Sequence, residues 1–225
     1  PEDLEKRTGV PTVGVIPMQY GHGLPEEDGV FDASPSGAAN SVNGTKAAGS
    51  AQIKVAVIAY PRISNLDEFQ PLKNCAGVQL VWARNPADLH GADWVILPGS
   101  KATAADMAWL RTQKLDAAIA AHAAAGGMVL GVCGGLQMLG EALIDTNAID
   151  GNGPGLGLLP LVTAFAVDKT VRPFTGQFAP IQGAWSALSG VALSGYEIHH
   201  GQTALHPAMV AAGVTATQVL PDGLA

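Results

Sequence analysis

Strand-sized apolar runs alternate with helix-like segments through the middle of the chain, and this alternation constrains the fold more than any other feature. Four β-rich runs cover Ile53–Tyr60, Val78–Trp82, Trp94–Leu97 and Val129–Val132. The Ala- and Leu-rich segment Thr103–Ala125 predicts one long helix or two short ones. Such alternation is typical of a three-layer α/β fold, with a mostly parallel sheet and helices on both faces. Ligand chemistry is then expected at the carboxyl ends of the strands.

The pattern changes after residue 150. Glycines at 151, 153, 155 and 157 precede short apolar runs at 158–165, 174–179 and 191–198, which favour an antiparallel extension or edge strands. The glycines do not form a dinucleotide-binding fingerprint, because no strand leads into them and no helix opens from them.

The composition fits a buried parallel sheet and argues against several classes of partner. Hydrophobic residues make up 48% of the chain and charged residues only 14%, as expected where strands are covered on both faces. A net charge of −7 without a basic cluster argues against nucleic acid, and no apolar stretch approaches the roughly 20 residues of a membrane span. We expect a cytoplasmic protein, since Cys75 and Cys133 suggest no disulfide framework.

Three regions are expected along the chain. Residues 1–24 contain what looks like the end of a helix, followed by one strand pattern, Val10–Pro17. We interpret this region as the tail of a preceding domain. Residues 25–50 turn acidic and then rich in Gly, Ala, Ser and Asn, which predicts a linker. Residues 51–225 form the third region. We find no P-loop and no metal-binding motif, so neither an ATP site nor a metal site is predicted in this chain.

A cysteine stands where the fourth strand meets the next helix. The sequence Gly131-Val132-Cys133-Gly134-Gly135 has the form of a nucleophile elbow, whose tight strand-to-helix turn exposes the central side chain. The amino end of a helix favours a thiolate, so we expect a lowered pKa for Cys133. The alternative is a buried cysteine that serves as a small hydrophobe in a Gly-rich turn.

A cysteine nucleophile needs a base and donors for the oxyanion. The candidate base is one of two adjacent histidines, His199 and His200, at the end of an apparent strand, where alternate side chains face opposite sides. Two polar residues in an exposed turn are the alternative. Candidate oxyanion donors are the backbone N–H of Gly134 and an N–H of the Pro98–Ser100 turn, around Gly99.

These motifs together carry a family resemblance. Gly131, Cys133, Gly135 and Gln137 spell G-x-C-x-G-x-Q, which resembles the triad-type glutamine amidotransferases. Residues 60–72, beginning Tyr-Pro-Arg-Ile-Ser-Asn, resemble the cobyric acid synthase branch of that superfamily, as do residues 95–101, 155–160 and 195–203.

The resemblance implies a role for each matching residue. Cys133 would be the nucleophile, His199 the general base, and Gln137 a contact to bound glutamine. The wider superfamily usually places a Glu two residues after the His, and this chain has Gly201 there, so a Cys/His dyad is implied. Glu197 would share a strand face with His199 and is a hypothetical substitute for the missing carboxylate.

The resemblance further implies a glutaminase domain that releases ammonia from glutamine through a Cys thioester. The ammonia would pass to an N-terminal ATP-dependent synthetase domain, which amidates side-chain carboxylates of the corrinoid adenosylcobyrinic acid a,c-diamide in cobalamin biosynthesis. ATP and Mg²⁺ are expected only in that domain, and this chain looks truncated at its carboxyl end as well. Alternatives are a glutaminase for cobyrinic acid a,c-diamide synthesis or for peptidoglycan precursor amidation, a non-catalytic docking domain, and a cysteine hydrolase of similar geometry.

Overall fold

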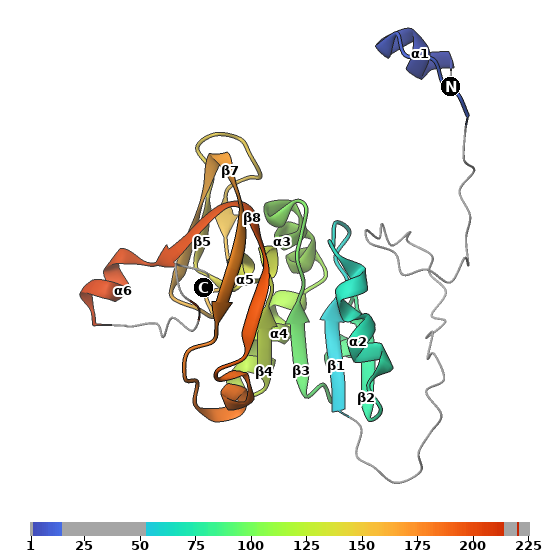
Figure 1. Ribbon diagram of the computed structural model, residues 1–225. Coiled ribbons are helices and arrows are strands. Elements are labelled where there is room, and N and C mark those ends of the chain that lie inside the picture. Colours follow the sequence, from blue (N-terminus) through green and yellow to red (C-terminus); the bar gives the residue numbers. More distant parts are fainter. Residues whose placement is uncertain (1, 15–52, 214–219, 221–225) are drawn as a thin grey trace.

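The computed structural model of Figure 1 describes residues 2–14, 53–213 and 220. Its first sheet has the strand order β2-β1-β3-β4, and every neighbouring pair is parallel. The four strands are β1 (Ile53–Ile58), β2 (Val78–Ala83), β3 (Trp94–Leu97) and β4 (Met128–Gly131). The predicted parallel sheet is therefore confirmed, and each predicted strand lies within two residues of its observed bounds.

Helices cover both faces of this sheet, as predicted. The 3-10 helix η1 (Leu66–Phe69) and α2 (Gln70–Asn74) pack on one face, against a buried cluster of Val55, Val57 and Ile96. On the other face, α3 (Thr103–Thr112) and α4 (Leu115–Ala124) bury Met107, Leu110, Leu115 and Ile119 against Ile58 and Leu97.

The segment 103–125 thus forms two helices and not one. Lys114 separates them with a left-handed φ of 61°, which a continuous helix does not contain. Figure 1 shows α3 and α4 as separate helices beside the first sheet.

A second sheet follows with the order β6-β5-β7-β8. Its strands are β5 (Ala142–Ile144), β6 (Gly153–Pro154), β7 (Leu161–Gln177) and β8 (Ala192–Leu205). Strands β7 and β8 form a long antiparallel ribbon, so the predicted antiparallel extension is present. The runs predicted at 158–165 and 174–179 are wrong in detail, because both belong mostly to the single strand β7, across an irregularity between Phe165 and Thr170, whereas the run 191–198 lies almost wholly in β8. Strand β5 pairs with β7 in parallel.

Short elements complete the described part of the chain: α1 (Glu2–Thr8), the 3-10 helices η2 (Pro86–Leu89) and η3 (Gly183–Leu188), α5 (Gly134–Leu139) and α6 (Pro207–Ala211). Helix α5 contacts both sheets and so joins the two halves of the fold. None of the helices that the structure describes has the length and apolar character needed to cross a bilayer.

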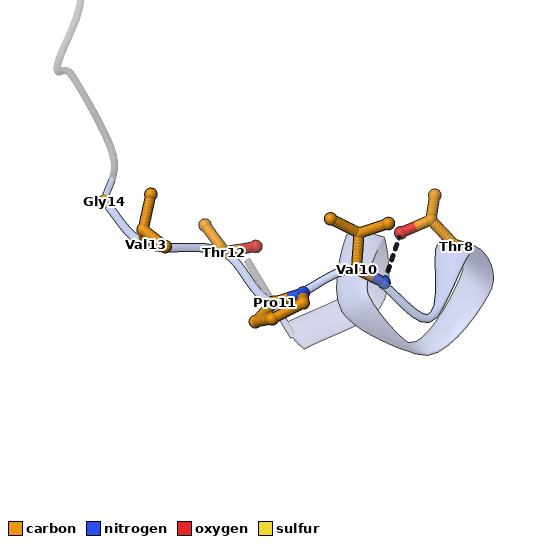
Figure 2. Close-up of a pocket in the computed structure, with 6 residues that line it drawn as sticks. All are labelled: Thr8, Val10, Pro11, Thr12, Val13 and Gly14. Carbon is orange, nitrogen blue, oxygen red and sulfur yellow. Dashed lines mark hydrogen bonds between the residues drawn. The ribbon is translucent and has the colours of Figure 1, made fainter.

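The amino-terminal segment differs from its prediction. Residues 10–14 form no strand, and Val10 and Val13 are largely exposed. Figure 2 shows this stretch as an extended chain after α1, around a hollow lined by Thr8 and residues 10–14, none of them ionisable. The strand failed because one apolar run has no neighbour in the described residues to complete its hydrogen bonds. The rest of that run, residues 15–17, and the predicted linker 25–50 lie outside the described residues.

Candidate active site

Cys133 occupies a strained turn between β4 and α5. Its φ of 51° and ψ of −111° lie outside the regions that L-residues favour, and it precedes the first residue of α5. The preceding Val132 N–H donates to the Leu97 carbonyl of β3 over 2.9 Å, so the turn starts from the sheet edge. This is the sharp strand-to-helix turn that the sequence predicted.

Two glycines allow the turn because neighbouring backbone lies where their side chains would be. A Cβ at Gly135 would overlap the carbonyl oxygen of Leu97, and one at Gly131 would lie 2.6 Å from the backbone of Leu136. Both contacts are with backbone, which has no rotamer to change. Close packing of α5 on β3 and β4 therefore requires glycine at both positions.

The Cys133 side chain is solvent-exposed, yet the predicted lowering of its pKa is wrong. Desolvation around the sulfur raises the pKa, and the nearby Glu68 carboxylate raises it further. The backbone N–H of Gly134 and the Lys169 ammonium act in the opposite direction without outweighing the desolvation. A single N–H at the end of the six-residue helix α5 is too little to stabilise a thiolate, so the thiol needs a base.

The turn after β3 lies beside the cysteine, as the oxyanion prediction requires. A Cβ at Gly99 would be 3.9 Å from Cys133 Cβ and 2.5 Å from Ser64 Oγ. A second loop crosses this turn, since Ser64 N–H donates to the Gly99 carbonyl and Lys101 N–H donates to the Arg62 carbonyl, each over 2.9 Å. The Tyr-Pro-Arg-Ile-Ser-Asn segment, residues 60–65, therefore borders the site.

A buried aspartate fixes these two loops to each other. Asp106 in the first turn of α3 is fully buried and accepts hydrogen bonds from Ser100 Oγ at 2.6 Å and from Arg62 N at 3.3 Å. The Arg62 guanidinium lies 3.6 Å from the same carboxylate. Burial raises the pKa of Asp106, while Ser100 and Arg62 partly offset that effect. In addition, the buried Tyr60 hydroxyl donates to the Pro98 carbonyl.

Gln137 is buried inside the site. Its Oε1 accepts from Thr103 Oγ1 at 3.4 Å, and its Nε2 lies where a Cβ of Gly201 would be. Gln137 thus links α5 to α3 and to β8, and the predicted contact with glutamine stays a prediction.

His199 lies on β8 and pairs with a carboxylate. Its Nε2 is 2.8 Å from Oε1 of Glu197, and its Nδ1 is buried without a hydrogen-bond partner among the described residues. His200 is directed the other way and its Nδ1 lies 3.2 Å from the Ala166 carbonyl, so the two histidines do face opposite sides.

The structure brings β8 to the elbow helix without joining the two predicted catalytic side chains. Gly201 packs on Gln137, and Gly201 shares a strand face with His199, while Gln137 follows Cys133 by one helical turn. Within residues 53–213, no hydrogen bond connects Cys133 with His199.

The family model described as the CobB/CobQ-like glutamine amidotransferase domain matches residues 54–223. The chain belongs to this family.

Relatives of this amidotransferase domain are cobyric acid synthases. The chain is 68% identical over 225 residues to "Cobyric acid synthase" of Acidovorax ebreus (strain TPSY), with all of this chain and 43% of that protein covered. It is 67% identical over 225 residues to the protein of the same name from Paracidovorax citrulli (strain AAC00-1), of which it covers 44%. The chain therefore spans less than half the length of the curated relatives it matches.

A solved structure is also similar to the domain. "Structure of PurLQS from Thermotoga maritima" aligns with a TM-score of 0.48 and 18% identity, over 67% of this chain and 68% of that one.

Sequence reasoning missed several residues of the amidotransferase site. Glu68 and Lys169 act on the charge of Cys133, Arg172 binds Glu197, and Asp106 fixes the loop of Gly99. Glu68, Lys169 and Arg172 are far in sequence from the residues that they affect, so no local spacing could reveal them. Asp106 is close in sequence to Ser100, but its other partner, Arg62, belongs to a distant loop. Within the described residues, no three His, Cys, Asp or Glu side chains gather as a metal site would require.

Proposed function

We propose that this domain hydrolyses glutamine through a thioester on Cys133. The observation that carries the proposal is the elbow conformation of Cys133, at a φ of 51°, inside a domain of the glutamine amidotransferase family. A strained backbone conformation costs free energy, and a cysteine with a purely structural role would have no reason to adopt it.

In the proposed reaction His199 takes the thiol proton and the Cys133 sulfur attacks the side-chain amide carbon of glutamine. The C–N bond then breaks, and the nitrogen leaves as ammonia with the proton returned by the histidine. Water, deprotonated by the same histidine, cleaves the thioester and releases glutamate. Backbone N–H groups of Gly134 and Gly99 would stabilise the oxyanion in both steps, since both residues border the sulfur.

We propose Gln137 as a support of this site in addition to the contact with glutamine expected from its motif. Its amide is buried between α3 and β8, where it sets the distance between the elbow helix and the His199 strand. A wrong distance there would misplace the base relative to the thiol.

For the whole protein we propose the activity named in its relatives. The ammonia would reach an ATP-dependent synthetase part of the same polypeptide, which amidates the carboxylates of a corrinoid acceptor, adenosylcobyrinic acid a,c-diamide, in cobalamin assembly. ATP and Mg²⁺ would be bound by that part. A thiol nucleophile needs a reducing environment, which fits the proposed location in the cytoplasm.

Labelling with 6-diazo-5-oxo-norleucine, a glutamine analogue that alkylates the nucleophile, tests the proposal. We expect mass spectrometry to find a single adduct on Cys133, no adduct in Cys133→Ser, and protection by glutamine. Cys75 is also an exposed thiol and serves as the internal control for indiscriminate alkylation. Equal labelling of Cys75 and Cys133, or no labelling of the folded chain, would overturn the proposal in favour of a non-catalytic docking domain.

A further inference from the structure

Glu197 and His199 form a hydrogen-bonded pair along one face of β8. The two residues alternate with outward-facing neighbours, so their side chains lie on the same side of the strand. Glu197 is buried at 7% exposure, and its Oε1 is 2.8 Å from His199 Nε2. A buried carboxylate at that distance is a fixed partner and not a transient surface contact.

The pair determines which ring nitrogen carries the proton. An ionised carboxylate can only accept a hydrogen bond, so a neutral His199 must hold its proton on Nε2. The lone pair then lies on Nδ1, which is buried and has no partner within the described residues. Nδ1 is therefore the basic nitrogen of the neutral ring.

Arg172 holds Glu197 from the neighbouring strand. The two residues are direct cross-strand partners in the β7–β8 register, and the Arg172 Nε–H donates to Oε2 of Glu197. Arg172 and, second, His199 lower the pKa of Glu197, which keeps the carboxylate ionised at neutral pH. Thr170, the cross-strand partner of His199, is uncharged.

The opposite side of His199 has no room for a carboxylate. Position 201 shares the strand face, but a Cβ there would overlap Gln137 Nε2 and approach Thr163 Cγ2 to 2.8 Å. On this strand face the neighbour of His199 that carries a carboxylate is Glu197 at position 197.

We propose that Glu197, held by Arg172, is a positioning residue that fixes the Nε2–H tautomer of His199 and leaves Nδ1 as the base for Cys133. This inference rests on the proposed glutaminase reaction. In this proposal Glu197, together with Arg172, takes the role of an acidic residue at position 201, where a side chain does not fit.

The first test measures the tautomer without activity. Two-bond ¹H–¹⁵N correlation spectra of the full chain, assigned with His199→Gln and recorded where the imidazole is neutral, should show a proton on Nε2 and a bare Nδ1. In Glu197→Gln the amide no longer demands that tautomer, so the His199 signals should shift. A wild-type His199 protonated on Nδ1 alone would overturn the proposal, whether or not any variant folds.

The second test is kinetic. Glu197→Gln should lower kcat for glutamine by about 100-fold or more with little change in KM, since correctly oriented proton transfer contributes 10²–10⁴-fold. Glu197→Asp should recover part of the loss. Tyr196→Phe is the matched control, because Tyr196 is the exposed neighbour on the other face of β8.

The outcomes separate the two proposals. A wild-type chain that hydrolyses no glutamine, but has the Nε2–H tautomer, contradicts the proposed function and leaves the pairing intact. A wild-type chain that is active, with a folded Glu197→Gln variant within twofold of its kcat, contradicts the positioning role alone.

Discussion

Gly201 of β8 lies so close to Gln137 of α5 that a Cβ at position 201 would overlap the side-chain amide. Gln137 follows Cys133 by one helical turn, and Gly201 follows His199 by two residues on one strand face. The contact therefore sets the spacing between the helix that follows Cys133 and the strand that carries His199.

Gly201→Ala should push β8 away from α5. The new methyl group meets Gln137 and Thr163 in a buried region, and overpacking of this kind costs about 1–3 kcal/mol. We expect a lower urea midpoint and a loss of glutaminase activity larger than the loss of stability explains, because the Cys133–His199 spacing changes.

Gly195→Ala on the same strand is the control. A Cβ at Gly195 would have no atom within 4 Å, and its φ is not positive, so the substitution should leave stability the same or slightly higher. Equal effects of the two substitutions would show that the Gln137 contact does not limit the site.

Replacing Cys133 by glycine should stabilise the fold relative to replacing it by alanine. At a φ of 51° and ψ of −111° a side chain adds strain of about 1–3 kcal/mol, which glycine avoids. Urea unfolding should therefore rank Cys133→Gly above Cys133→Ala, although neither can form a thioester.

The same pair of substitutions at Cys75 gives the opposite expectation. Cys75 has a φ of −72° and ψ of 121°, which any residue adopts, so glycine there only adds entropy to the unfolded chain. Cys75→Ala should be the more stable of the two. A preference for alanine at both positions would contradict the strained elbow.

The parallel sheet could be predicted because its strands are short and mostly apolar runs. The central strands β1 and β3 are largely buried, whereas the edge strand β2 carries the exposed Gln79 and the edge strand β4 is half-buried. The ribbon β7–β8 could not be predicted at its full length. At the irregularity in β7 the ribbon carries polar residues such as Asp168 and Lys169. These residues interrupt the alternation of apolar and polar side chains by which a strand is predicted.

The site was predictable where one motif or strand contains both partners. Cys133 and Gly134 belong to the elbow, and the two-residue period placed Glu197 beside His199. Arg172 and Asp106 were not predictable, since the contact of Arg172 with Glu197 depends on strand register and the contact of Asp106 with Arg62 depends on helix packing between distant segments. The pKa of Cys133 was predicted in the wrong direction because desolvation depends on the packed structure.

Asp106→Asn should loosen the loops of Gly99 and Arg62. The asparagine NH₂ group cannot accept the hydrogen bonds that a carboxylate accepts from Ser100 and Arg62 N–H, so a buried donor loses its partner at a cost of about 1–3 kcal/mol. Asp67→Asn, on the exposed surface of η1, is the control and should change stability little.

The effect of Asp106→Asn should depend on pH. Burial raises the pKa of Asp106 above its unfolded value of about 3.9, so the folded wild type binds more protons than the unfolded chain in that window. Wild-type stability then falls, relative to the variant, as pH rises from about 4 through the raised pKa. Urea unfolding should find the largest gap near pH 4 and a smaller one at pH 7. A gap that widens with pH would mean that Asp106 is stabilised as the anion.

The reactivity of Cys133 should also depend on pH, in a direction set by its raised pKa. In a Cys75→Ser background Cys133 is the single thiol of the chain. Its rate of alkylation by iodoacetamide should still rise with pH above the ordinary cysteine pKa of about 8.5.

Two charges near the sulfur allow a matched test. Lys169→Ala removes a cation that lowers the pKa, so the rate profile should move to higher pH, whereas Glu68→Gln removes an anion that raises it, so the profile should move to lower pH. Alkylation quenched at fixed times and quantified by mass spectrometry between pH 6 and 10 gives the rate profiles of the parent protein and the two variants. Shifts of the same sign for both variants would mean that loop packing, and not the charge of these side chains, controls the thiol.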